Sequence, residues 1–368
     1  MKKFFQSGAL FVAILAIGTI AKGGAFQMEM ADVPYNPADP ATQQPNGPEY
    51  SFSMGRYEVT VAQYMTFLNN AEANQGNERG DNLTFRANGD IGLPIEEADM
   101  VFSVSANNTN GYFNYGISYN AGQPVGSRYG YDSAFAQHPI VGVSWYGAVK
   151  FCNWLTIEQG LPLAERVYNE GSGSGDWRPK VGTQPLTNAQ RQELVDSYAG
   201  FRLPMDENAN TGAGPFNEWH KAAAWDGDAM VNRVYGFGRD VLTDSDANSL
   251  DSGDPWETGT TPVGYYDGIN LDTSPNENYY GIYDLSGNAM EWMQDWDVGD
   301  RRTERGGIYY DDDPAVELQV DWPRNQLPRS MPFGVGFRVA QVPEPATMMM
   351  LTLGGLALIQ RRKRRACK

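Results

Sequence analysis

The most informative segment of this chain is Gly281-Ile282-Tyr283-Asp284-Leu285-Ser286-Gly287-Asn288-Ala289-Met290-Glu291-Trp292. Asp284 and Glu291 supply carboxylates, and Gly287 and Ala289 can offer backbone carbonyls between them. Carboxylate and carbonyl oxygens are the hard ligands that Ca²⁺ prefers. The segment is therefore compatible with a calcium site at these four residues. The alternative is that the acids cap turns and solvate the surface.

Other short motifs precede and follow this segment. In chain order they are GRYEVT (55–60), HPIVGVSW (138–145), FRLP (201–204), Glu218-Trp219, YGFG (235–238), TPVG (261–264), Arg305-Gly306-Gly307 and GVGFRV (334–339). The series resembles the formylglycine-generating enzyme family, also called the sulfatase-modifying factor family, from Ser51 to Gln341. The resemblance implies a single irregular α+β domain with low regular secondary structure, related to the C-type lectin-like fold.

Two amphipathic helices are predicted from the residues themselves. Thr60 and Gln63 form a capping-box pattern before one apolar face, and Ser144 is a candidate N-cap for a second helix. Cys152 lies on the apolar face of the second helix, so we expect a buried structural thiol.

The family resemblance bears on calcium at two places. It implies that Asp284, Gly287, Ala289 and Glu291 correspond to one calcium site of the family. A second family site aligns with Asn248, Ser249, Asp254 and Trp256, where Ser249 and Trp256 would act through their carbonyls. The preceding run Asp244-Ser-Asp246-Ala-Asn248 begins like an EF-hand loop, but Ser249 replaces the required glycine.

The resemblance fails at the residues that carry oxidation. Oxidising members of the family bind copper through two cysteines, five residues apart, just after the Arg-Gly-Gly motif. Asp311 and Val316 occupy those positions here, and Cys152 and Cys367 lie elsewhere. Because Cu(I) requires soft thiolate ligands, we expect no copper and no family oxidase activity.

A retained scaffold without these cysteines predicts a non-catalytic binding or structural module of the cell envelope or extracellular matrix. Its groove would be lined by Tyr309, Tyr310, Trp322 and Arg338 and would take a peptide or glycan. The alternative is an enzyme of altered chemistry with an acidic or metal-assisted site at Asp311-Asp312-Asp313, although a run of charges is more often a solvated surface.

The N-terminal segment has the order of a secretory signal peptide. Lys2 and Lys3 precede an apolar run over 8–20 and small residues at 23–25. We therefore expect residues 1–25 to be removed by signal peptidase after export across a bacterial inner membrane, with a buried N-terminal helix as the alternative. Residues 26–50 would form a leader arm, and 51–341 the domain.

The C-terminal tail, residues 342–368, has a different composition. Pro343-Glu344-Pro345 precede an apolar run over 346–359 and the cations Arg361, Arg362, Lys363, Arg364 and Arg365. This order resembles the PEP-CTERM sorting signal. The resemblance implies transient anchoring in the inner membrane, cleavage by an exosortase, and release or attachment at the cell surface. A simple tail anchor is the alternative.

The formal net charge is −17, and the clustered cations lie in the two terminal segments. The body between them is therefore more acidic than the whole chain. Such a surface argues against nucleic-acid binding, which requires clustered cations.

Overall fold

The computed structural model describes residues 26–96, 99–106, 115–207, 212–256, 259–296 and 299–342. The predicted signal peptide and the sorting residues from Pro343 to Arg365 lie outside the described residues. In the ranges that are described, no helix is both long and apolar enough to cross a bilayer.

Both predicted helices form with the predicted caps. Helix α1 (Val61–Ala73) begins after Thr60, whose side chain accepts from the Gln63 backbone N–H while the Gln63 side chain accepts from the Thr60 N–H. Helix α3 (Trp145–Glu158) begins after Ser144, whose hydroxyl accepts from the Gly147 N–H. The other α-helices within the described ranges are α4 (Asn188–Ser197), α5 (Glu218–Ala224) and α6 (Pro314–Glu317).

The largest sheet has the strand order β14-β13-β12-β15. These strands are β12 (Met290–Trp296), β13 (Arg302–Arg305), β14 (Arg324–Gln326) and β15 (Val335–Gly336). Strands β12 and β15 are parallel, and the other pairs are antiparallel. An irregularity between Trp292 and Trp296 shifts the register, so that Trp296 is paired with Arg302.

A second sheet joins both ends of the described chain. It has the order β1-β2-β16, with β1 (Met30–Val33), β2 (Phe52–Gly55) and β16 (Ala340–Gln341). Part of the predicted leader arm is thus an edge strand.

The remaining strands are short and scattered. They are β3 (Thr84–Phe85), β4 (Ile91–Gly92), β5 (Met100–Phe102), β6 (Ser118–Tyr119), β7 (Tyr129–Gly130), β8 (Tyr168–Asn169), β9 (Arg178–Pro179), β10 (Trp225–Asp226) and β11 (Val231–Asn232). The content of 20% helix and 18% strand confirms an irregular α+β fold with little regular structure.

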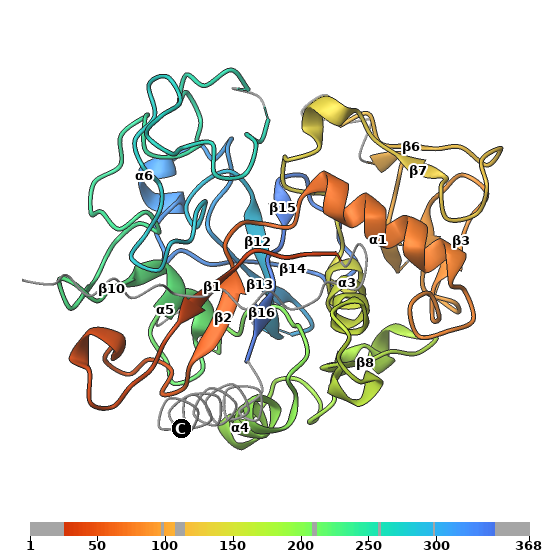
Figure 1. Ribbon diagram of the computed structural model, residues 1–368, viewed down its shortest axis with the longest axis horizontal. Coiled ribbons are helices and arrows are strands. Elements are labelled where there is room, and N and C mark those ends of the chain that lie inside the picture. Colours follow the sequence, from red (N-terminus) through yellow and green to blue (C-terminus); the bar gives the residue numbers. More distant parts are fainter. Residues whose placement is uncertain are drawn as a thin grey trace, which may run out of the picture.

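Aromatic side chains hold α1 and α3 against the sheets. Tyr64 and Phe67 of α1 contact Phe151 of α3 at ring-centroid distances of 6.0 and 5.6 Å, and Phe151 also meets Phe337 at 5.3 Å. Cys152 is buried in this core, as predicted, and burial raises the pKa of its thiol. Figure 1 shows α1 and α3 on one side of the central strands, with α5 and α6 on the other.

Candidate functional site

Asp311 lies where the family resemblance implies a copper-binding cysteine. Its side chain is only 2% exposed and accepts hydrogen bonds from the Ile308 N–H at 2.8 Å and from Arg324 Nη2 at 2.5 Å. Burial raises the pKa of Asp311 to about 6, against the opposing effect of Arg324. Val316 lies in α6. Cys152 is the one cysteine in the described part of the chain, so no cysteine pair is present there.

The acidic run Asp311-Asp312-Asp313 does not converge on one point. Asp312 and Asp313 are exposed, whereas Asp311 is buried. Arg324 joins Asp311 to Glu317 at 2.6 Å, so its guanidinium already neutralises the buried member. This arrangement stabilises the turn that leads into α6.

The four residues predicted to line a groove lie at different depths. Tyr309 and Arg338 are 0% exposed, Tyr310 is half-buried, and Trp322 is 40% exposed. Tyr309 and Arg338 belong to the core, so a ligand could not touch them without opening it. The four side chains therefore do not line one open groove, because Tyr309 and Arg338 are part of the packed core.

The first set of predicted calcium ligands surrounds a buried arginine. Glu291 accepts from Arg338 Nε at 2.7 Å and from Trp219 Nε1 at 3.0 Å. Asp284 accepts from the Gly264 N–H at 2.6 Å. The carboxylate expected to bind calcium is thus paired with a guanidinium.

Glu58 adds a third buried carboxylate, which the sequence analysis quoted within GRYEVT but did not assign. Its Oε1 accepts from Asn288 Nδ2 at 3.1 Å, and its Oε2 has no hydrogen-bond partner. Burial and repulsion by Asp284 raise the pKa of Glu58 well above its usual value. Glu58 also lines a cavity of about 340 Å³. Three buried acids thus lie near one arginine, and the raised pKa of Glu58 favours its uncharged, protonated form.

The second set is linked to the first through the backbone. The Asn248 carbonyl accepts from the Asn288 N–H at 2.9 Å. A Cβ at Gly287, whose φ is +85°, would come within 2.4 Å of that carbonyl oxygen, so the close approach requires glycine. Ala289 and Ser249 are buried beside these residues.

Asn248 also carries a buried amide oxygen without a hydrogen-bond partner. Asp254 accepts from the Trp256 N–H at 2.7 Å and from the Tyr266 hydroxyl at 3.0 Å. The unpartnered oxygen fits a hard cation. No group of three or more His, Cys, Asp or Glu side chains in the described ranges is arranged to hold a metal, so calcium here would depend largely on amide and carbonyl oxygens.

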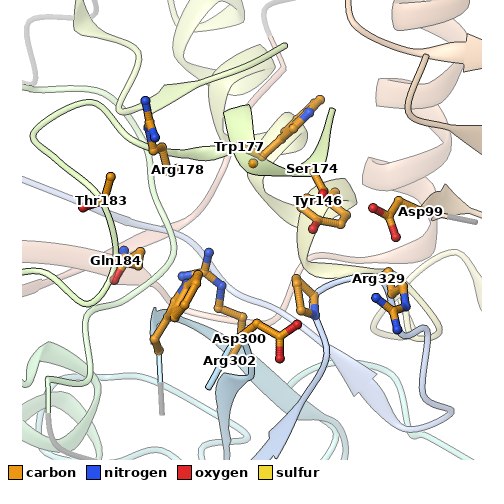
Figure 2. Close-up of a pocket in the computed structure, with 13 residues that line it drawn as sticks. Asp99, Tyr146, Ser174, Trp177, Arg178, Thr183, Gln184, Asp300, Arg302 and Arg329 are labelled. Carbon is orange, nitrogen blue, oxygen red and sulfur yellow. The ribbon is translucent and has the colours of Figure 1, made fainter. Parts of the chain in front are cut away.

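A pocket of about 270 Å³ lies at another place, between the start of α3, the segment 174–184 and the beginning of β13. Figure 2 shows Arg302 and Gln184 on one side of this space and Tyr146 and Trp177 on the other. None of the residues of this pocket was assigned to a site from the sequence. The only local signal was the pair Trp177-Arg178 at the end of the glycine-rich segment GSGSGDWR (171–178).

Arg302 is the most unusual residue of this pocket. It is 2% exposed, and its guanidinium lies over the ring of Trp145 at 3.8 Å and over that of Trp296 at 4.9 Å. Nη1 donates to the Gln294 carbonyl at 3.0 Å, while Nε has no hydrogen-bond partner. Burial lowers the pKa of Arg302 to about 9.

Two other residues add unpartnered polar atoms. Both side-chain amide atoms of Gln184 and the indole Nε1 of Trp296 are buried without hydrogen bonds. Buried polar groups are hydrogen-bonded in the great majority of cases, so such atoms beside one pocket mark a place where a ligand or water completes the bonding.

Residues 18–343 match the sulfatase-modifying factor enzyme 1-like domain family, and residues 341–365 match the PEP-CTERM protein-sorting motif. A serine/threonine-protein kinase pkn1 of Chlamydia caviae is 24% identical over 165 residues, which are 45% of this chain and 15% of that protein. The chain thus matches only a small part of this curated relative.

Two solved structures are similar to this chain. The crystal structure of CarF has a TM-score of 0.51 and 22% identity, and the match covers 86% of this chain and 98% of CarF. PvdO from Pseudomonas aeruginosa has a TM-score of 0.39 and 18% identity, with 85% and 91% covered. At these identities the likeness to CarF shows the fold alone.

Proposed function

The chain belongs to the sulfatase-modifying factor enzyme 1-like family, and from this premise we propose that it is a binding module that no longer performs copper-dependent oxidation. The PEP-CTERM motif indicates an exported protein that is processed by an exosortase and sorted to the cell surface. Removal of residues 1–25 by signal peptidase and transient anchoring by the tail remain part of the proposal.

The observation that carries the binding role is the pocket at Arg302. Gln184, Trp296 and Arg302 all line this pocket, and each carries a buried polar atom without a hydrogen-bond partner among the described residues. A set of donors and acceptors that the protein does not satisfy by itself supports recognition of a polar ligand, a glycan or a peptide of the envelope or matrix.

Two further observations favour binding over chemistry. The described chain has no cysteine pair, and soft thiolates are required to hold Cu(I). Asp311 is buried, and its two oxygens accept hydrogen bonds from Ile308 and Arg324, which is the arrangement of a structural acid. The altered-chemistry enzyme is therefore the weaker alternative.

Calcium is proposed as a structural ion. Its support is the unpartnered oxygen of Asn248, together with the buried carboxylates of Asp284 and of Glu291, the latter already paired with Arg338. A bound cation would hold the 248–256 segment against the 284–291 segment. It would take no part in ligand chemistry.

The exported protein, purified after processing, should be screened on glycan and peptide arrays. The test variant is Gln184→Ala, because Gln184 makes no side-chain hydrogen bond within the described residues and its loss leaves the fold intact. Gln192→Ala, on the exposed face of α4, is the matched control. We expect array binding that Gln184→Ala reduces and Gln192→Ala leaves unchanged. Absence of any ligand, or ligands indifferent to Gln184, would reject the proposal.

A further inference from the structure

The chemistry of the Arg302 pocket indicates which ligand it takes. Building on the proposed function, we propose that the pocket binds an acidic sugar, a single ring bearing a carboxylate within a uronate-containing polysaccharide. The inference rests on an unpaired buried cation, on the amide and indole groups beside it, and on the size of the space.

Arg302 lacks a carboxylate partner within the described residues. Asp295, a nearby acid, is already paired with Arg191 at 2.7 Å and accepts from the Asp206 N–H at 2.9 Å. Asp300 is exposed, and its charge acts on Arg302 only from beyond ion-pair distance. A buried charge without a partner is unfavourable, so an anion that enters the pocket replaces a missing interaction.

The free edge of the guanidinium favours a planar anion. Both faces of Arg302 are covered by indole rings, and Nη1 is used by the Gln294 carbonyl. The Nε and Nη2 edge remains without a hydrogen bond to the described residues, and the two N–H groups of such an edge can donate parallel hydrogen bonds to a carboxylate. Arginine thus supplies a positive charge and a planar pair of hydrogen-bond donors, whereas a lysine would supply only the charge.

The surroundings add positive charge to an acidic protein. Arg178 and Arg329 also line the pocket, and neither is within ion-pair distance of an acid among the described residues. The acids that line it are Asp99 and Asp300. Three arginines against two aspartates make the pocket locally cationic, although the whole chain carries −17.

The neutral groups fit sugar hydroxyls better than a peptide side chain. The Gln184 amide offers donors and an acceptor, and Trp296 Nε1 offers a donor. A hydroxyl both donates and accepts, so a ring with several hydroxyls can satisfy these atoms together. The volume of about 270 Å³ lies just below the roughly 300–1,000 Å³ of drug-sized pockets, which suits one ring of a longer chain.

The test is calorimetric titration of the exported protein with oligosaccharides of galacturonate, glucuronate and mannuronate, each compared with its methyl ester. The ester keeps the ring and hydroxyls and removes the charge. We expect the acid form to bind at least about tenfold more tightly than the ester, because the ester leaves Arg302 unpaired. Sulfated neutral oligosaccharides test whether another anion is preferred.

Three variants locate the binding. Arg302→Lys keeps the charge and removes the planar edge, and Arg301→Lys makes the same change at the exposed neighbour. We expect the first to weaken acid binding by about tenfold and the second to leave it unchanged. Arg178→Gln, at the rim, should weaken binding severalfold. If Arg302→Lys does not fold, Arg178→Gln and the ester comparison still decide.

The outcomes separate this inference from the proposed function. Equal binding of acid and ester, preference for the sulfated sugar, or binding of peptides alone through Gln184 would overturn the acidic-sugar inference while the binding role stands. Binding of no array ligand would overturn both.

Discussion

Replacement of Asp311 by Asn tests how the buried carboxyl at the family's cysteine position affects the stability of the fold. The folded protein holds the pKa of Asp311 at about 6, compared with 3.8 ordinarily, chiefly because the side chain is buried. The folded state therefore binds this proton more tightly than the unfolded state does. The stability contributed by protonated Asp311 is fully present below about pH 3.8 and is lost as the pH rises through about 6.

The size of the effect follows from the two pKa values. A difference of about two pH units corresponds to roughly 3 kcal/mol at 1.36 kcal/mol per unit. Asparagine cannot titrate, so the free energy of unfolding of the wild type relative to Asp311→Asn should fall by about 3 kcal/mol between pH 3 and pH 7. The lost hydrogen bond to Arg324 adds an offset that does not alter the direction.

The assay is urea unfolding of the exported protein, followed by tryptophan fluorescence at several pH values. Asp312→Asn, an exposed carboxylate one residue away, controls for net charge and should change stability by less than about 0.5 kcal/mol. A wild-type advantage that increases with pH would show that the Arg324 ion pair dominates. A constant difference would show that burial does not affect the ionisation of Asp311, and either result refutes the reasoning.

Three further predictions concern calcium, the core and the lost activity. EDTA should lower the melting temperature and Ca²⁺ should restore it, and Asn248→Ala should abolish this response; a melt that ignores EDTA rejects the calcium proposal. Glu218→Gln should destabilise by about 3–5 kcal/mol in urea unfolding, because it leaves Arg202 buried without its carboxylate, whereas exposed Glu193→Gln should change little. With copper, oxygen and a sulfatase-derived cysteine peptide, the exported protein should form no formylglycine, and any turnover contradicts the predicted loss of oxidation.

Local features of the fold could be predicted because local chemistry determines them. The capping box at Thr60 and the cap at Ser144 depend on residues within one turn, and both formed as expected. The family motifs predicted the irregular architecture because their order is specific. Composition alone could not have specified it.

The site was harder to predict because its parts are distant in sequence. Arg338 was assigned to a groove and Glu291 to calcium, yet the two meet as a buried ion pair across 47 positions. Tyr146, Trp177, Trp296, Arg302 and Arg329 reach the pocket from separate segments. No single stretch of sequence contains enough of them to reveal a site, and only the packing brings them together.

The most direct test of pocket binding is a crystal structure of the exported protein soaked with a uronate oligosaccharide. We predict density for a sugar ring beside Trp296 and Gln184, with its carboxylate against the Nε edge of Arg302. Density at Asp311 and Trp322 instead, or an Arg302 pocket holding only water at saturating ligand, would contradict it.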